Sequence, residues 1–231
     1  MIEVGGISAV LTDIEGTTSA MAFVHDVLFP YARLHLPDYV RVHEGELASI
    51  LDDVRKEAGR GDLDIDGVIS MLLAWMDEDR KATPLKALQG RIWRHGYEAG
   101  ALKGHIYPDA VAGLQRWRTQ GLKLYVYSSG SIEAQRLIFG HSDYGDLTPW
   151  FSGFFDTTSG GKLQSGSYTG IAVAMELLPD RILFLSDNPG EIAAAGRAGM
   201  RTARLMRDEP PVDGAVAGFD QISIAARADA A

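Results

Sequence analysis

The sequence has no cysteine among its 231 residues. Disulfide bonds, thiolate nucleophiles and cysteine-ligated zinc are therefore excluded, and any metal ion must be bound by oxygen or imidazole ligands. No apolar run approaches the ~20 residues that a membrane-spanning helix requires, and the N-terminus has no basic patch followed by an apolar stretch. We therefore expect a cytoplasmic protein that makes no contact with a membrane.

Positive charge is also scarce, because 22 Lys and Arg face 31 Asp and Glu, giving a formal net charge of -9. A field of this sign repels nucleic acid, so we expect none as a partner. It does not exclude an anionic substrate, since a metal ion or a few local donors can reverse the potential inside one cleft. Long heptad repeats are missing as well, which favours a monomer.

Three short apolar runs rich in β-branched or aromatic residues indicate strands that are buried on both faces. They cover Ile7 to Leu11, Leu122 to Tyr127 and Ile182 to Leu185, and a shorter run is Phe154-Phe155. Apolar residues at helical spacing lie between them. Strands alternating with helices predict an α/β fold with a parallel sheet.

The first two runs are too far apart for a single crossover helix. Residues 22–100 read as almost wholly helical, with Pro37 and Gly59-Arg60-Gly61 as expected breaks. We therefore predict an inserted helical subdomain over 22–100, with a core domain formed by 1–21 and 101–231. Pro108 suits the first turn of a helix that returns the chain to this core and ends near Gly121.

Polar residues follow each apolar run at once, where ligands collect in open α/β sheets. They are Asp13-Ile14-Glu15-Gly16-Thr17-Thr18, Ser128-Ser129-Gly130-Ser131, Lys162 and Ser186-Asp187-Asn188. Gly16 lets the chain turn sharply, so the carboxyl groups of Asp13 and Glu15 can face one ligand, and with Asp187 they form a site for a hard cation. Mg²⁺ is the cation that such oxygen ligands favour, often beside a substrate phosphate.

Each of these residues also has a plain structural interpretation. Ser128 and Ser129 could cap the helix that begins near Ser131, and Lys162 could be a solvated loop charge. Glu191, three residues after Asn188, suits helix capping, with a role near the metal as the alternative. The functional interpretation is favoured because every piece lies just past a predicted strand.

These motifs, taken in order, resemble the four-motif signature of the haloacid dehalogenase-like hydrolases, many of which are phosphatases. Longer stretches resemble one family among them, the enolase-phosphatases of methionine salvage. They are Phe23-Val24, Asp26 to Ala32, Leu88 to Trp93, Leu102 to Asp109 and Phe139 to Ser142. The resemblance covers about Ile7 to Leu205 and implies a Rossmann-like three-layer core with a central parallel sheet and an inserted α-helical cap.

The resemblance also implies the roles of individual residues. Asp13 would be the nucleophile that accepts the phosphoryl group, and Glu15 the general acid and base. Asp13, Asp187 and the backbone carbonyl of Glu15 would bind one Mg²⁺ per subunit. The substrate phosphate would be bound by Ser128, Ser129 and Lys162. The implied partner is a small phosphorylated diketone, methylthio-diketopentyl phosphate, which the family enolises and then dephosphorylates to the acireductone.

Two positions depart from the family pattern, namely Gln164, where many relatives have Glu, and the loop at Asn188-Pro189-Gly190. Neither departure removes a required group, although they affect the charge and shape around the metal. Two other functions stay open. One is a general small-molecule phosphatase of the same superfamily, and the other is a non-catalytic phosphate-binding module, which would not need the acid at Glu15.

Overall fold

The computed structural model describes residues 1–212 and 214–225, and it divides into two compact units. An α/β unit comprises Met1–Met21 and the chain from Lys103 onward, and a helical unit comprises Ala22–Leu102. Each unit buries apolar side chains of its own. Within the described residues, no helix combines the length and the apolar composition that crossing a membrane requires.

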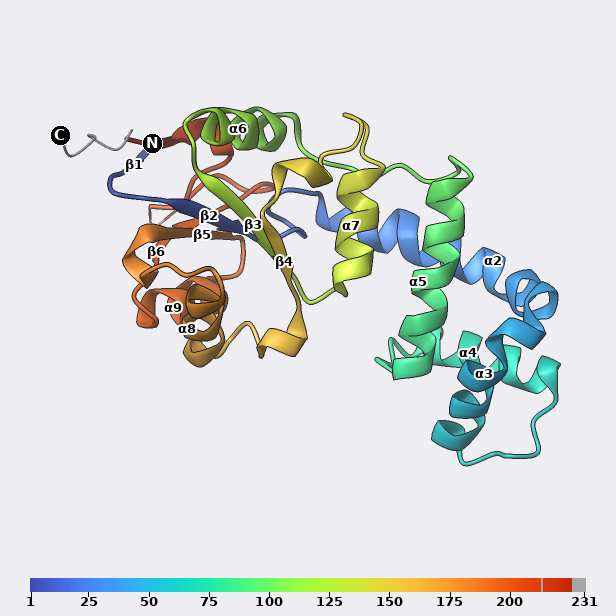
Figure 1. Ribbon diagram of the computed structural model, residues 1–231. Coiled ribbons are helices and arrows are strands. Elements are labelled where there is room, and N and C mark those ends of the chain that lie inside the picture. Colours follow the sequence, from blue (N-terminus) through green and yellow to red (C-terminus); the bar gives the residue numbers. More distant parts are fainter. Residues whose placement is uncertain (213, 226–231) are drawn as a thin grey trace. The chain divides into compact units, whose positions relative to one another are not determined.

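The α/β unit is built on a 5-stranded sheet with the order β4-β3-β2-β5-β6 (Figure 1). The strands are β2 (Ala9–Thr12), β3 (Lys123–Tyr127), β4 (Gly153–Phe155), β5 (Ile182–Ser186) and β6 (Arg201–Arg204). All neighbouring pairs are parallel, and Thr12 of β2 is in register with Val126 of β3 and with Leu185 of β5. The strand that carries Asp13 at its end is therefore the central strand of the sheet.

Helices cover both faces of this sheet, as Figure 1 shows. They are α6 (Pro108–Thr119), α7 (Ile132–Gly140), α8 (Ser165–Ala174) and α9 (Pro189–Arg197). On one face, Leu11 and Phe184 pack with Tyr168 of α8 and Ala194 of α9. On the other, α6 and α7 pack against β3 and β4. Because both faces are covered, β2 and β5 read as continuous apolar runs instead of alternating.

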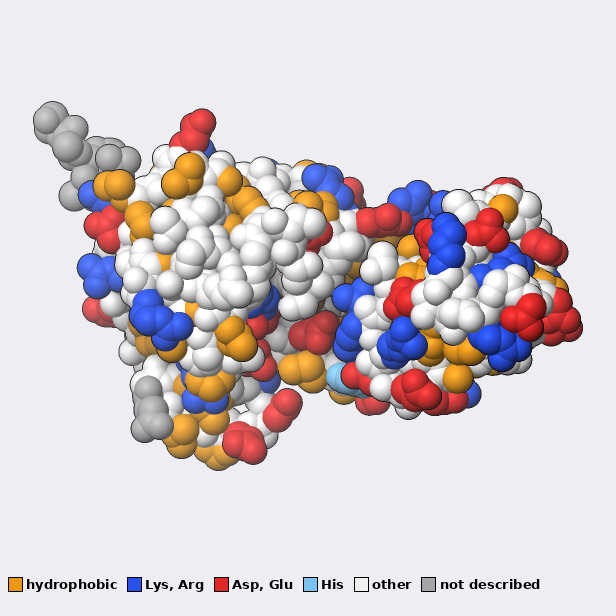
Figure 2. All heavy atoms as spheres, turned by 90° about the horizontal axis from the view of Figure 1, so that it is seen from below, with side chains coloured by type: hydrophobic (Ala, Val, Ile, Leu, Met, Phe, Trp, Pro, Cys, Tyr) orange, Lys and Arg blue, Asp and Glu red, His pale blue; other side chains and the backbone are white. Residues whose placement is uncertain are grey.

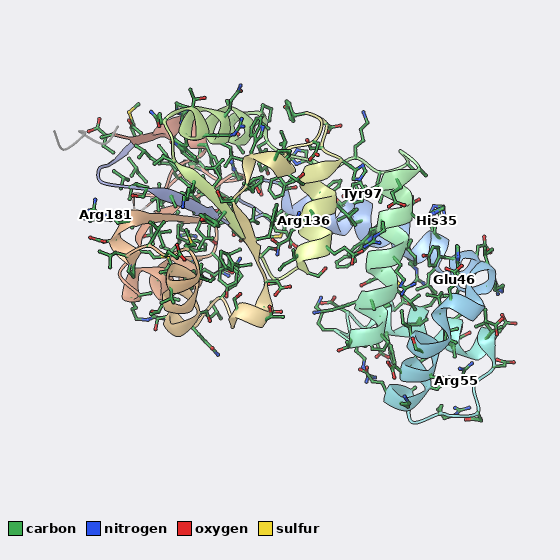
Figure 3. The ribbon with its side chains drawn as sticks, viewed as in Figure 1. His35, Glu46, Arg55, Tyr97, Arg136 and Arg181 are labelled. Carbon is green, nitrogen blue, oxygen red and sulfur yellow. The ribbon has the colours of Figure 1, made fainter. Side chains whose placement is uncertain are left out.

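Smaller elements complete the α/β unit. β1 (Ile2–Val4) and β7 (Ile222–Ile224) form a parallel 2-stranded sheet. Single helical turns lie at η2 (Thr148–Trp150), η3 (Thr157–Ser159), η4 (Pro179–Arg181) and η5 (Phe219–Gln221). Arg181, labelled in Figure 3, donates to the carbonyl of Gly6 at 3.1 Å and so marks the amino-terminal edge of the sheet.

The helical unit begins with the short α1 (Met21–Phe23) and the π-helical turn η1 (Val24–Leu28). These run into α2 (Phe29–Val42), α3 (Glu44–Ala58), α4 (Ile65–Asp77) and α5 (Thr83–Glu98). The four longer helices enclose an apolar core that includes Leu36, Leu51, Leu72 and Leu88. Acidic and basic side chains alternate over the surface of this unit in Figure 2, as expected for a solvated face.

One expected break in the helical unit is confirmed and the other is wrong. Gly59 ends α3 in the left-handed conformation, with φ 66°, which glycine adopts without strain. Pro37 does not end a helix, because α2 continues through it to Val42. A proline inside a helix removes one hydrogen bond and costs ~3 kcal/mol, but Leu36 and Val40 on either side are completely buried, and this packing holds the helix together.

The fold class predicted from the sequence is confirmed, since four of the expected runs form the parallel strands β2, β3, β4 and β5. The helix expected from Pro108 is α6, which ends at Thr119, just before Gly121. β6 was not predicted. Its sequence, Arg201-Thr-Ala-Arg204, is not an apolar run because β6 lies at the edge of the sheet.

Gly104 gives a test of how tightly the α/β unit is packed. Its backbone N–H donates to the carbonyl of His141 at 2.8 Å, and an added Cβ would overlap the carbonyl oxygen of Ile138. We expect Gly104→Ala to lower the free energy of unfolding by about 1–3 kcal/mol, because the backbone of α7 has to move. Urea unfolding followed by circular dichroism measures this loss.

Gly170→Ala is the matched control, because Gly170 lies inside α8 with open space where its Cβ would be. This substitution should raise the free energy of unfolding by about 0.5–1 kcal/mol, the usual difference between alanine and glycine in a helix. Equal effects of the two substitutions would show that the contact at Gly104 is not tight.

Candidate active site

Asp13 lies directly beyond the carboxyl end of β2, the central strand. Its N–H donates to the carbonyl of Leu185 on β5 at 2.9 Å, which continues the ladder by one residue. Its own carbonyl accepts from the hydroxyl groups of Thr12 at 3.0 Å and Thr18 at 3.1 Å. The backbone around Asp13 is thus fixed from three directions, and its side chain is almost completely buried.

The loop after Asp13 turns at Gly16, which has φ 66° and allows a close approach from β5. A Cβ at this position would lie 2.5 Å from the Oδ2 atom of Asp187. The backbone N–H of Asp187 donates to the hydroxyl of Thr17 at 3.0 Å. Glycine is therefore required here for two reasons, and the two acidic loops predicted from the sequence lie side by side.

Lys162 joins this cluster from the loop between η3 and α8. Its Nζ atom lies 2.6 Å from Oδ1 of Asp13 and 2.8 Å from Oε2 of Glu191. Only 7% of the lysine side chain is exposed. Its backbone carbonyl accepts from the hydroxyl of Tyr168 at 2.7 Å, which anchors the loop to α8. The lysine is thus a buried charge with two acidic partners, and its interpretation as a solvated loop charge is wrong.

The pKa values reflect this crowding of charges. Burial raises the pKa of Asp13 to about 7, with Lys162 opposing the shift and the carboxylate of Glu191 adding to it. Burial and then Glu191 raise the pKa of Asp187. Burial alone would lower the pKa of Lys162, but Asp13 and Glu191 outweigh it and raise that pKa. The lysine therefore stays charged, whereas the carboxylates lack enough positive charge nearby.

Glu191 is a member of this cluster whose role the sequence left open. Its Oε2 atom accepts from the hydroxyl of Ser186 at 2.8 Å in addition to pairing with Lys162. Asn188 caps α9, because its side chain accepts from the N–H of Gly190. A capping acid at position 191 would accept from the N–H of Asn188, but this N–H donates to the hydroxyl of Ser186 at 3.1 Å. The capping interpretation of Glu191 is therefore wrong, and the acid is turned toward the lysine. Its position one helical turn beyond Asp187 was the feature of the sequence that could have indicated its place in this cluster.

Ser128 and Ser129 lie beyond the carboxyl end of β3, the strand next to β2. Ser128 is buried, and its hydroxyl accepts from the N–H of Gly130 at 3.3 Å. Ser129 is exposed. Neither residue caps α7, because Ser131 does so by accepting from the N–H of Ala134. The two serines are therefore available at the same edge of the sheet as Asp13.

Glu15 is partly exposed and lies in the turn between Asp13 and Gly16, where its backbone forms a bridge to Ser19. It is thus the most open of the acids that the sequence singled out in this loop. Asp13 and Glu15 occupy the same short turn, as expected from their spacing and from Gly16.

The donor set around Asp13 fits a hard divalent cation. The carboxylates of Asp13, Asp187 and Glu191 are opposed by Lys162, with Arg204 adding a weaker field at Asp187. A cation would correct this excess of negative charge, and carboxylate and carbonyl oxygens suit Mg²⁺. No group of three or more His, Asp or Glu side chains in the described part of the chain is arranged to hold a metal.

Comparison with known proteins identifies the family of the chain. Residues 7–199 match the family model of the haloacid dehalogenase-like hydrolases. The chain is 59% identical to the enolase-phosphatase E1 of Azotobacter vinelandii, over 95% of this chain and 99% of that protein. It is 60% identical to the enolase-phosphatase E1 of a Pseudomonas aeruginosa strain, over 90% of this chain and 84% of that protein.

Solved structures show the same fold. The UTR4 protein of Saccharomyces cerevisiae superposes with a TM-score of 0.78 at 31% identity, covering 97% of this chain and all of that one. The hydrolase YfnB of Bacillus subtilis, a structure described as bound to magnesium, has a TM-score of 0.56 at 16% identity, with 93% and 96% of the two chains covered. The second likeness concerns the fold alone.

Removal of Lys162 should expose the charge imbalance as a loss of stability that depends on pH. In Lys162→Met, the buried carboxylates of Asp13 and Glu191 lose their partner, which costs ~3–5 kcal/mol for a buried pair. Burial already raises the pKa of Asp13 to about 7, and without the lysine, which opposes this shift, that pKa should rise further above its unfolded value. Protonation of Asp13 therefore supports folding at low pH, and this support is lost as the pH rises through the folded pKa.

The free energy of unfolding is measured in urea with EDTA present, at about pH 5 and about pH 8. The difference between Lys162→Met and the unmodified protein should be larger at the higher pH. Lys123→Met, at the exposed first residue of β3, is the control and should change little at either pH. An equal loss at both pH values would contradict the buried pairing.

Proposed function

The chain belongs to the haloacid dehalogenase-like hydrolase family and, within it, to the enolase-phosphatases, and on this premise we propose how its own residues carry the reaction. The substrate is methylthio-diketopentyl phosphate of methionine salvage. It is first enolised at the carbon that bears the phosphate and is then dephosphorylated to the acireductone. The site beyond β2 and β5 supplies the groups for the second step.

The observation that carries the proposal is the buried contact between Lys162 and Asp13, at 2.6 Å, beyond the carboxyl end of the central strand. A buried pair of lysine and carboxylate adds little net stability, since apolar residues in place of both partners would stabilise the fold as well. It has a clear value for phosphoryl transfer, where positioning and neutralisation of charge supply most of the catalysis. Lys162 can attract the phosphate and orient the nucleophile together.

In the transfer step, a carboxylate oxygen of Asp13 attacks phosphorus and forms an aspartyl phosphate. The bond between phosphorus and the ester oxygen breaks, and the electron pair leaves with that oxygen. Glu15, the partly exposed acid of the same turn, donates its proton to the departing oxygen. This proton is what distinguishes a phosphatase from a dehalogenase, whose halide leaves without one.

In the hydrolytic step, the ionised Glu15 accepts a proton from a water molecule. The resulting hydroxide attacks the phosphorus of the aspartyl phosphate, and the carboxylate of Asp13 is released together with inorganic phosphate. Glu15 thereby returns to its protonated form, so that one residue serves as acid and then as base.

Binding of the ester is assigned to groups around Asp13. Ser128 and Ser129 offer hydroxyl and backbone N–H groups to the phosphate oxygens, and Lys162 offers its charge. Asp13, Asp187 and the backbone carbonyl of Glu15 would hold one Mg²⁺. When bound, Mg²⁺ would neutralise the charge that gathers on the phosphate and polarise the substrate carbonyl next to it.

The helical unit, Ala22–Leu102, is proposed as the cap that excludes water and recognises the methylthio end. Exclusion of water has two effects on the reaction. It protects the enolised intermediate, and it strengthens the electrostatic contacts that hold the phosphate.

Replacement of the nucleophile tests the first step. Asp13→Asn should abolish phosphate release from methylthio-diketopentyl phosphate, because the amide cannot attack phosphorus. Enolisation should continue at a reduced rate, since it does not use this oxygen as a nucleophile but draws on the Mg²⁺ that Asp13 would help to hold. Enolisation is monitored as the exchange of the hydrogens on the phosphate-bearing carbon with solvent deuterium. Phosphate release is measured with a colorimetric assay.

Asp180→Asn is the control, because Asp180 is an exposed residue of η4 at the amino-terminal edge of the sheet. It should release phosphate at the normal rate. Near-normal turnover by Asp13→Asn would defeat the assignment of the nucleophile. Equal rates for the unmodified protein on simple esters such as phosphoglycolate would favour a general phosphatase instead.

Removal of the metal tests the ligand set. Excess EDTA should stop phosphate release, and added Mg²⁺ should restore it, because the carboxylates of Asp13 and Asp187 repel an anionic substrate when no cation is bound. Asp187→Asn should raise the Mg²⁺ concentration needed for half-maximal activity by about tenfold or more. Full activity in EDTA would contradict a role for a divalent cation.

A further inference from the structure

The carbonyl of Thr17 is held by an arginine from a distant part of the chain. Arg207 lies just beyond β6 and donates to this carbonyl through Nε at 3.0 Å and through Nη2 at 2.6 Å. Only 7% of the arginine side chain is exposed. A buried guanidinium that donates two hydrogen bonds to one carbonyl holds that peptide group in a fixed position.

The guanidinium is itself fixed on its other sides. Its Nη1 atom donates to Oδ2 of Asp109 at 2.7 Å and to the carbonyl of Ala217 at 3.2 Å. Its carbon lies 4.3 Å from the ring centroid of Tyr107 and 5.3 Å from that of Phe219. Arg207 therefore has little freedom to move, and neither does the loop that it contacts.

Thr17 in turn connects the two acidic loops. Its hydroxyl accepts from the backbone N–H of Asp187 at 3.0 Å, and its own N–H donates to the carbonyl of Ile14 at 3.2 Å. The side chain is fully buried. A displacement of Thr17 would thus change the position of Asp187 relative to the turn that carries Asp13.

A second arginine holds the other loop in the same manner. Arg204, the last residue of β6, donates through Nε to the carbonyl of Asp187 at 3.1 Å. The two arginines stand three residues apart and approach the acidic loops from the β6 side. Their hydrogen bonds to the acidic loops go to the backbone carbonyls of Thr17 and Asp187, so they leave the carboxylate oxygens of Asp13 and Asp187 available for a cation.

We infer that Arg207 is a positioning residue for the divalent cation, acting through the carbonyl of Thr17 to hold Asp13 and Asp187 at the separation that one ion requires. The inference rests on the proposed function only for the identity of the metal ligands. Mg²⁺ demands near-ideal geometry from its ligands, so a loop that shifts by a fraction of an ångström binds it less well. Arg207 itself touches neither the ion nor the substrate.

A purely structural role would make a different prediction. Arg207 also contacts the segment around Ala217 and Phe219, so it could serve only to attach that segment. Arg116 of α6 contacts the same segment, because it donates to the carbonyls of Phe219 at 3.0 Å and Ile222 at 3.2 Å. Neither of these two hydrogen bonds goes to the acidic loops. Arg116 is therefore the matched control.

The experiment compares Arg207→Lys with Arg116→Lys. Both variants keep the charge and lose the planar fork. Binding of Mn²⁺ to the metal-free protein is measured by the loss of the free Mn²⁺ signal in electron paramagnetic resonance, and the melting temperature is recorded for each variant. We expect the dissociation constant to rise about tenfold in Arg207→Lys and to stay unchanged in Arg116→Lys. Unchanged Mn²⁺ affinity in a folded Arg207→Lys would overturn the inference.

A second variant tests the same connection from the side of Thr17. Thr17→Val removes the hydroxyl that accepts from Asp187 while leaving Arg207 in place, and it should weaken Mn²⁺ binding to a similar extent. In the double variant, the loss should be clearly smaller than the product of the two single losses, since both act on one connection. A loss equal to that product would contradict the inference.

These outcomes separate the inference from the proposed function. If the unmodified protein binds Mn²⁺ but releases no phosphate from methylthio-diketopentyl phosphate, the proposed function fails and the role of Arg207 is still tested by the affinities. If phosphate is released normally and Arg207→Lys binds Mn²⁺ as tightly as the unmodified protein, only the role of Arg207 fails.

Discussion

Two carboxylates, those of Asp13 and Glu191, contact one buried lysine, and the carboxylate of Asp187 lies on the neighbouring loop within the field of Glu191. This excess of negative charge is the constraint that the surrounding part of the α/β unit has to meet. Like charges repel strongly where water is excluded. The repulsion has to be offset by parts of the fold that carry no charge. Here they are the completely buried strands β2 and β5 and the hydrogen bonds that extend their ladder to Asp13.

The same arrangement connects stability to ligand binding. In the proposed function a cation binds between the carboxylates and relieves their repulsion, so the folded protein would gain stability with the logarithm of the cation concentration. The loops do not have to be ordered by the ion, because Thr12, Thr18 and Gly16 already fix the turn after Asp13. A site prepared in this way loses little free energy to reorganisation when the ligand binds.

The central sheet could be predicted from the sequence because β2, β3 and β5 are buried on both faces and therefore read as apolar runs. Parallel strands place their carboxyl ends at one edge, so the meeting of Asp13 with Lys162 followed from the order of the motifs. β6 could not be predicted, because an edge strand tolerates Arg201 and Arg204. The continuation of α2 through Pro37 depends on tertiary packing, which no local pattern contains.

The site was predictable only in part for a related reason. Glu191 lies in the first turn of α9, where acids commonly cap helices, and its contact with Lys162 exists only in three dimensions. Arg207 gave no local signal, since its partners at Thr17 and Asp109 are 190 and 98 residues away in sequence. Contacts of this range become visible only when the chain is folded.

The helical unit, Ala22–Leu102, is a continuous segment with an apolar core of its own, and both of its ends join the α/β unit near one place, where the N–H of Ala20 donates to Nδ1 of His105 at 3.1 Å. An insertion of this kind is structurally independent of the sheet. Its helices can diverge, or be exchanged for others, without disturbing the strands on which the acidic turn is built. With the helical unit in its proposed role as cap, selectivity toward new phosphate esters can change within this one internal stretch of the gene while the reaction chemistry is inherited unchanged.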